Sequence, residues 1–288
     1  MKIIELAGIK IGFRAEFGIS CDEKMNMFSV ESKEEECDFV FDVKCGDFPQ
    51  ATDKKLVYQD PKVCVYEGKN VRLSYYRHPA REWEFCVMEK ERRVWIYVLP
   101  RYKKYAENMW NLISKIELSS RLLEKQTLIL HASFIIYEER AILFTGPSGI
   151  GKSTQAELWE KNMNSEIING DRVLMRKKGE YLYAFGLPFS GSSGICANKE
   201  APIRAIVILG QGDTNCVCRI AVAEAVKFLY SQVAVIRWKE RDVMKTLGLL
   251  EELVIRVPVL KFTCRPEKEA VYALNDYFEK EEERRCEY

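Results

Sequence analysis

The chain has 288 residues, of which 47% are hydrophobic and 30% are charged, and this length can hold two domains or one large domain with an appendage. Its 44 basic and 43 acidic residues give a net charge of +1, which argues against a surface that coats nucleic acid. No apolar run approaches the roughly 18 residues that a membrane-spanning helix requires.

The chain starts with Met1-Lys2-Ile3-Ile4-Glu5, which lacks the apolar core and cleavage site of a signal peptide. We therefore expect a cytoplasmic protein. Its ten cysteines are scattered and include no C-x-x-C pair. Cys216 and Cys218 form a C-x-C on a predicted strand, where alternation points them to opposite faces. We expect reduced thiols rather than disulfides or a metal site.

Residues 1–101 are predicted to form a β-rich module. Short segments rich in β-branched and aromatic residues are separated by turn signals such as Cys45-Gly46-Asp47 and Asp60-Pro61. The predicted strands are Phe39–Val43, Lys62–Tyr66, Val71–Tyr76 and Arg93–Val98. We expect an antiparallel sheet, and this part of the chain carries no recognisable catalytic motif.

Residues 102–288 show the alternating strands and helices of an α/β domain. One helix or two are predicted over Tyr105–Lys125, and a strand over Thr127–Ile136 turns through Glu138-Glu139-Arg140 into an apolar strand at Ala141–Phe144. The remaining predicted elements follow in chain order: a helix from Gln155, strands at 166–169, 172–175, 181–185 and 203–209, helices at 223–232 and 241–256, a strand at 258–264 and a closing helix from Pro266.

The apolar strand at Ala141–Phe144 leads into the segment Gly146-Pro147-Ser148-Gly149-Ile150-Gly151-Lys152-Ser153-Thr154. This segment matches the phosphate-binding pattern G-x-x-x-x-G-K-[ST] at every required position. Glycines let the backbone N–H groups point at one anion, and the following helix adds its positive dipole end. The pattern predicts that Lys152 reaches the β- and γ-phosphates of a nucleotide and that the Ser153 hydroxyl binds Mg²⁺. ATPases, GTPase switches and kinases of several folds share this loop.

Three parts of the chain together resemble the catalytic half of HPr kinase/phosphorylase: His131, the Gly146–Ser153 loop and the segment Gly170-Asp171-Arg172-Val173. Later stretches resemble a narrower branch of HPr-kinase-related proteins, members of which often accompany peptide-modifying genes and in some cases phosphorylate a peptide serine. These stretches are Phe185–Ser192, Ala201-Pro202-Ile203, Val257-Pro258-Val259 and Arg265–Val271. The resemblance covers roughly Leu128 to Leu274.

The resemblance implies an α/β fold with a P-loop kinase core of the HPr kinase and phosphoenolpyruvate carboxykinase type. It leaves the N-terminal β-rich module, the first hundred residues, unexplained. It also implies ATP or GTP and Mg²⁺ as cofactors, with Asp171 as the general base for an acceptor hydroxyl; a plain Gly-Asp turn is the alternative. His131 is expected to orient Asp171 or donate to the phosphate, or else to be a core histidine. Arg219 or Arg204 is expected to supply transition-state charge, although the spacing does not choose between them.

The chain departs from the family pattern at three places. Gly170 stands where the family usually has a second acid, and Thr154 stands where it usually has Glu. The family's Glu-Ile-Arg-Gly-like stretch has no clear match; Gly186–Ser193, within a glycine- and serine-rich loop from Gly186 to Gly194, occupies its place. These departures argue against reverse phosphorolysis and against HPr as the acceptor. The serine-rich end of that segment is either a second anion or substrate loop or a connector.

These observations lead to one main functional hypothesis, an ATP- and Mg²⁺-dependent kinase that phosphorylates a serine-type hydroxyl on a peptide or protein. A small-molecule phosphotransferase and a nucleotide-binding regulator without turnover are the alternatives. The expected partner is the peptide or protein acceptor, with no nucleic acid or membrane, and a homo-oligomer is left open. The β-rich module either recognises the acceptor, makes a subunit contact or covers the core.

Overall fold

The computed structural model describes residues 1–77, 82–91 and 93–286, and its chain divides into two compact units, Met1–Arg121 and Leu122–Tyr288. The division therefore falls after Arg121 rather than after the predicted Arg101. The residues between these two points belong to the first unit because they bond to its N-terminal segment. The Ser20 amide donates to the Glu107 carbonyl at 2.7 Å, and the Trp110 indole donates to Asp22 at 2.8 Å.

The described residues of the first unit form an eight-stranded sheet in the order β1-β2-β3-β8-β7-β6-β5-β4. Each of the four predicted strands overlaps an observed one, whereas β1, β2, β4 and β7 were not predicted. The strands are β1 (Lys2–Leu6), β2 (Ile9–Ala15), β3 (Phe39–Cys45), β4 (Lys55–Gln59), β5 (Val63–Gly68), β6 (Val71–Arg77), β7 (Trp83–Lys90) and β8 (Arg93–Val98).

The prediction of a purely antiparallel sheet was wrong for this unit, because β3 pairs in parallel with both β2 and β8. Parallel neighbours need a long crossover. The segment from β2 to β3 supplies one, with the short helix α1 (Glu23–Asn26) and a 3₁₀ turn at Glu34–Glu36.

Three short helices replace the predicted helix or helix pair: α2 (Lys103–Ala106), α3 (Met109–Ile113) and α4 (Leu118–Glu124). Asn108 begins α3 as its N-cap, since its side chain accepts from the Trp110 amide at 2.9 Å. Glu117 has a positive φ of 51° and so interrupts the helical backbone before α4.

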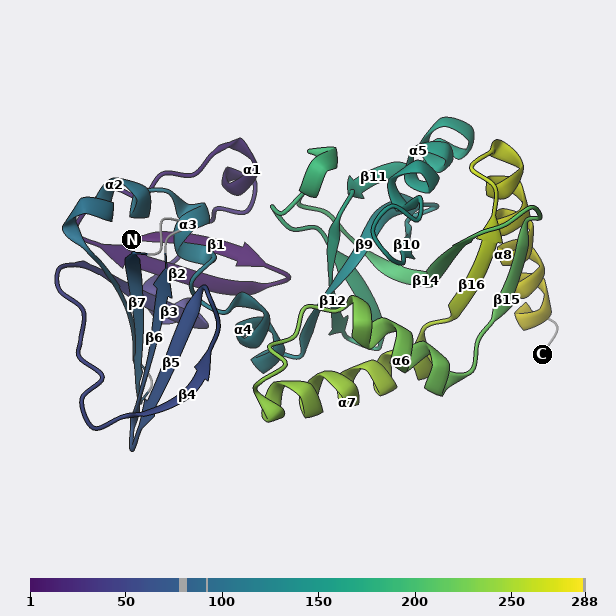
Figure 1. Ribbon diagram of the computed structural model, residues 1–288. Helices are drawn as coiled ribbons and strands as arrows, with labels where there is room; N and C mark the ends of the chain where they lie inside the picture. The colour runs from purple at the N-terminus through teal and green to yellow at the C-terminus, as the bar shows by residue number, and fades with distance from the viewer. Residues whose placement is uncertain (78–81, 92, 287–288) are drawn as a thin grey trace. The chain divides into compact units, whose positions relative to one another are not determined.

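The second unit is a mixed α/β structure built on two long strands, β9 (Thr127–Tyr137) and β14 (Glu200–Gln211) (Figure 1). The first half of β9 pairs with β12 and its second half with β10 and β11, while β14 pairs with β13, β10 and β16. The other strands are β10 (Arg140–Thr145), β11 (Glu166–Asn169), β12 (Arg172–Lys178), β13 (Tyr181–Phe185), β15 (Cys216–Arg219) and β16 (Val259–Cys264).

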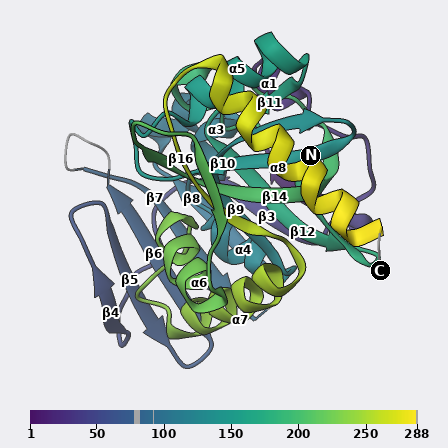
Figure 2. The ribbon, with the colours of Figure 1, turned by 90° about the vertical axis from the view of Figure 1, so that its right-hand side faces the viewer.

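Helices cover both faces of the β10-β14-β16 sheet. Side chains of β10 alternate between two cores, so that Phe144 packs with Trp159 and Phe278 while Leu143 packs with Leu229 and Leu253. The first core carries α5 (Lys152–Met163) and α8 (Lys268–Cys286), and the second carries α6 (Val222–Gln232) and α7 (Glu240–Arg256). Figure 2 shows α8 lying along one side of the sheet and α6 beside α7 on the other.

The cysteines of the described residues are free, and Cys216 and Cys218 lie two apart on β15 as predicted. Three of them, Cys64, Cys86 and Cys264, are buried. Within the described part of the chain no helix is both long enough and apolar enough to cross a membrane.

Candidate functional site

The segment from Gly146 to Gly151 is a loop between the end of β10 and the start of α5, which begins at Lys152. All three of its glycines have a positive φ, a backbone conformation that other residues rarely adopt. Gly146 has φ +149°, and a Cβ there would lie 3.0 Å from Cγ2 of Ile150. Gly151 has φ +110° at the N-cap of α5 and offers no side-chain cap to the first turn. The loop therefore presents the uncapped amides of the first turn of a 12-residue helix, which is an arrangement that binds anions.

The Lys152 side chain bonds back to the start of this loop. Its Nζ donates to the carbonyls of Gly146 at 2.9 Å and Pro147 at 3.1 Å, and the residue is only 8% exposed. Burial lowers the pKa of Lys152, and the negative charge of Asp171 acts in the opposite direction. The ammonium group is thus held at the loop and interacts electrostatically with Asp171.

His131 and Asp171 come together from different elements, as the predicted strand arrangement required. His131 lies on β9, opposite Arg172 of β12, and Asp171 is in the turn between β11 and β12. The His131 Nε2 atom lies 3.4 Å from Oδ1 of Asp171. The backbone fixes this approach, because the Ala132 amide donates to the Asp171 carbonyl at 3.0 Å and the Thr145 hydroxyl donates to the His131 carbonyl at 2.8 Å.

The pKa of His131 lies below its ordinary value, first because of burial and then because of the positive charge of Lys152, while Asp171 opposes the shift. The imidazole is therefore neutral at neutral pH. A neutral imidazole has one N–H, and placing it on Nε2 directs it at the Asp171 carboxylate. Three of the predicted site residues, His131, Lys152 and Asp171, consequently form one electrostatically coupled group at the end of β10.

Asn169 is the residue that the sequence reasoning missed. It is completely buried, and its Oδ1 accepts from the amides of Asp171 and Arg172, both at 2.9 Å. Its Nδ2 donates to the carbonyls of Leu187 and Phe189, also at 2.9 Å. One side chain therefore fixes both the Asp171 turn and the Gly186–Gly194 segment. The local signal was an asparagine before Gly-Asp, a common turn arrangement.

The serine-rich segment packs against the Asp171 turn. A Cβ on Gly191 would lie 2.7 Å from Cβ and Cγ of Asp171, and a Cβ on Gly170 would lie 2.2 Å from the Ser193 hydroxyl. The space that a side chain at position 170 would need is therefore filled by Ser193. Arg172, which the site prediction did not include, places its Nε 3.2 Å from Oδ2 of Asp171.

Arg219 is not brought to this site. It pairs with Glu281 of α8 at 2.5 Å, and it lines a small cavity with Arg140 and Arg204. Arg140 is the first residue of β10, whereas the loop follows its last residue, so this cluster lies toward the opposite end of that strand. Arg204 is also occupied there, in pairs with Glu138 at 3.2 Å and Glu282 at 2.9 Å. Strand register, which spacing along the chain does not reveal, separates both arginines from the loop.

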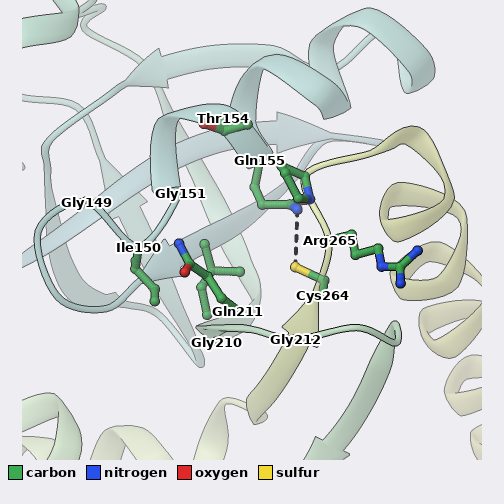
Figure 3. Close-up of a pocket in the computed structure, with 12 residues that line it drawn as sticks. Gly149, Ile150, Gly151, Thr154, Gln155, Gly210, Gln211, Gly212, Cys264 and Arg265 are labelled. Carbon is green, nitrogen blue, oxygen red and sulfur yellow. Dashed lines mark hydrogen bonds between the residues drawn. The ribbon is translucent and has the colours of Figure 1, made fainter.

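A cavity of about 420 Å³ opens beside the loop, between the start of α5 and the ends of β14 and β16 (Figure 3). Thr154 and Gln155 line it from α5, and Cys264 and Arg265 line it from the end of β16 and the residue that follows. Its volume is in the range of ligand pockets.

No family model matches the chain, and no curated protein matches it either. Among solved structures, the chain is similar to the HPr(Ser) kinase/phosphatase from Coxiella burnetii, with a TM-score of 0.32 and 13% sequence identity. The match covers 56% of this chain and 98% of that chain. A likeness this weak leaves the function to be argued from the site itself.

Proposed function

We propose that the protein is an ATP- and Mg²⁺-dependent kinase with a P-loop core of the HPr kinase type, and that it phosphorylates a serine-type hydroxyl on a peptide or protein. The observation that carries this proposal is the coupled group of His131, Lys152 and Asp171 at the mouth of the glycine loop. A phosphate-binding loop alone serves many nucleotide-binding proteins, but a carboxylate beside it supplies the base that hydroxyl phosphorylation uses.

In the proposed reaction, the loop amides and the Lys152 ammonium hold the β- and γ-phosphates. Asp171 takes the proton from the acceptor hydroxyl as its oxygen bonds to the γ-phosphorus, and the bond from that phosphorus to the bridging oxygen breaks to release ADP. His131 orients the carboxylate through its N–H. Asn169 supports the same geometry, since it fixes the backbone on which Asp171 sits.

The residues present fit a magnesium ion that arrives with the nucleotide. Mg²⁺ in such sites is bound by phosphate oxygens, waters and one or two protein groups rather than by a protein cage. Ser153 is exposed in the first turn of α5, and Asp171 is only partly buried. No three His, Cys, Asp or Glu side chains gather as a metal cluster among the residues that the structure describes. Ser153 would hold the ion, which supplies charge neutralisation on the phosphates when bound.

The Gly186–Gly194 segment is proposed to border the acceptor. It contacts Asp171 through Gly191, so a hydroxyl approaching that carboxylate passes along it. The β-rich unit is proposed to contribute recognition of the peptide or protein, because it has its own sheet and no catalytic group has been assigned to it. One observation favours a nucleotide-binding regulator as a second candidate: Ser193 fills the space beside Gly170, which leaves a single carboxylate in this turn.

Replacing Asp171 with Asn tests the proposal. The purified full chain is incubated with Mg²⁺ and γ-labelled ATP and a library of peptides that each carry one serine, with serine-to-alanine peptides as blanks. General base catalysis contributes about 10²–10⁴-fold, so Asp171→Asn should lower label transfer by that factor while ATP affinity is retained. Glu180→Gln, which changes an exposed carboxylate in the β12–β13 turn, is the matched control.

Lys152→Ala should abolish both ATP binding and transfer, whereas Lys161→Ala, at an exposed lysine of the same helix, should leave both unchanged. Loss of ATP binding in Asp171→Asn would mean that this carboxylate holds the metal. ATP binding without label transfer to any peptide would favour the regulator. Normal ATP affinity in Lys152→Ala would contradict the phosphate-loop assignment itself.

A further inference from the structure

Arg172 is a cation beside the proposed base, and the proposed reaction does not use it. It is the first residue of β12, and 47% of its side chain is exposed. Its Nε donates to Oδ2 of Asp171 at 3.2 Å, whereas the His131 Nε2 approaches the other carboxylate oxygen, Oδ1. The guanidinium is therefore held beside the carboxylate through one of its N–H groups.

Two further contacts fix the position of this guanidinium. The Arg172 amide donates to Oδ1 of the buried Asn169 at 2.9 Å, which anchors the backbone. The guanidinium carbon lies over the Phe189 ring, 5.9 Å from its centre, within the range of a cation–π contact. Phe189 belongs to the Gly186–Gly194 segment, which is proposed to border the acceptor. The cation is thus placed between the proposed base and the acceptor segment.

The outer end of this guanidinium is available to a ligand. Within the described part of the chain, the Nη1 and Nη2 atoms of Arg172 make no hydrogen bond or ion pair. Arg204 and Arg219, by contrast, are paired with Glu282 and Glu281 of α8. The parallel N–H groups of a free guanidinium match the two oxygens of a carboxylate.

The charges around Arg172 are compatible with an anionic group on the acceptor. Asp171 by itself would repel a carboxylate, and the guanidinium beside it offsets that repulsion because it lies within hydrogen-bond distance of the same side chain. The adjoining stretch 186–198 contains no acidic residue that would add to the repulsion. Arg172 is therefore a charged group on the acceptor side of the site that an incoming carboxylate can pair with.

We infer that Arg172 binds a carboxylate that the acceptor carries close to its serine, so that the kinase selects acidic peptides. The inference rests on the proposed function and names the class of its substrate. An extended peptide advances about 3.3 Å per residue, so an arginine in contact with the base reaches groups within about two residues of the serine.

The test uses matched peptide libraries that each contain one serine, with Glu, Gln or Lys at the positions around it and with acetylated and amidated ends. A second Gln library has a free C-terminus next to the serine and so presents a terminal carboxylate. The full chain is incubated with Mg²⁺ and γ-labelled ATP, and initial rates at low peptide concentration report kcat/KM. We expect the Glu library to react about tenfold faster than the blocked Gln library, and this preference to shrink as the salt concentration rises.

Arg172→Gln should remove the preference for Glu, and Arg172→Glu should reverse it in favour of Lys, because the charge beside the serine changes sign. The preference is a ratio measured within one variant, so a lower overall rate caused by a change next to Asp171 does not affect it. Arg241→Glu, at an exposed arginine in the first turn of α7, is the control and should keep the wild-type preference.

Each outcome decides the inference. A gain with either kind of carboxylate that disappears in Arg172→Gln supports it and identifies the source of the carboxylate. If the wild-type chain labels the Glu library and both Gln libraries equally, the acidic acceptor is overturned while the proposed kinase stands. An equal loss of rate with every library in Arg172→Gln also overturns it, because Arg172 would then act on the transferred phosphoryl group. If no library is labelled, both the acidic acceptor and the proposed kinase are overturned.

Discussion

Asn169 provides a stringent test of how the site is held together. Its side chain makes four hydrogen bonds in a fully buried position, two to the amides of Asp171 and Arg172 and two to the carbonyls of Leu187 and Phe189. Each such bond contributes about 0.5–1.5 kcal/mol net, so the four together are worth about 2–6 kcal/mol. The Gly186–Gly194 segment can open to water when released, which places the expected cost of Asn169→Ala at about 2–3 kcal/mol, the lower half of that range.

Calorimetric unfolding of the full chain measures this cost. A loss of about 2–3 kcal/mol lowers the Tm of a unit of this size by about 4–12 °C. Asn162→Ala is the matched control, because Asn162 makes a single bond from its Nδ2 to the Leu158 carbonyl at 2.7 Å. We expect that variant to lose only about 0.5–1.5 kcal/mol.

Asn169→Asp separates the two halves of the network. It keeps an acceptor for the Asp171 and Arg172 amides but loses the two donors, so the 186–194 amides should exchange with deuterium faster while Asp171 stays in place. Phosphoryl transfer should then fall less in Asn169→Asp than in Asn169→Ala. If Asn169→Ala costs no more than Asn162→Ala, Asn169 is not the anchor of the site.

Three further predictions concern the loop, the histidine and the units. Gly151→Ala should lower the free energy of unfolding by about 1–3 kcal/mol and remove most of the ATP affinity, because Gly151 has a φ of +110°. Gly248→Ala is the control, because Gly248 lies inside α7 with equally open space and no positive φ, and it should raise the free energy of unfolding by about 0.5–1 kcal/mol. Calorimetry that ranks the two variants otherwise would contradict backbone strain at position 151. The pKa of His131 measured by NMR should lie below its ordinary value, lower still in Asp171→Asn and higher in Lys152→Ala. Its contribution to stability should be full above the unfolded pKa of about 6.5 and should decline as the pH falls below that value, because the unfolded chain binds the proton first. A midpoint at or above about 6.5 contradicts this prediction. A fragment that begins at Leu118, the start of α4, keeps both hydrophobic cores of the second unit. It should unfold cooperatively and bind ATP but fail to phosphorylate the acceptor. Full acceptor phosphorylation by this fragment would refute the recognition role of the first unit.

The sequence determined the elements whose causes are local. The glycine loop, the strand before it and the helix after it are contiguous, so their order could be predicted from apolar runs and a spaced motif. The β9–β10 hairpin was equally local, because Glu138 and Glu139 form its turn with positive φ values of 48° and 57°. The approach of Asp171 to the loop could also be predicted from the order of the elements. β10 and β11 both run antiparallel to β9, so the loop after β10 and Asp171 after β11 lie at the same edge of the sheet.

Only the tertiary structure decided which distant groups share an environment. The sequence could not choose between Arg219 and Arg204 as a source of transition-state charge, and in the structure the register of β15 against β16 directs Arg219 to Glu281. Asn169 gained its importance from two carbonyls that lie farther along the chain, at Leu187 and Phe189. The division after Arg121 and the parallel pairing of β3 arose in the same way, because hydrogen bonds between remote segments leave no periodic pattern in the sequence that forms them.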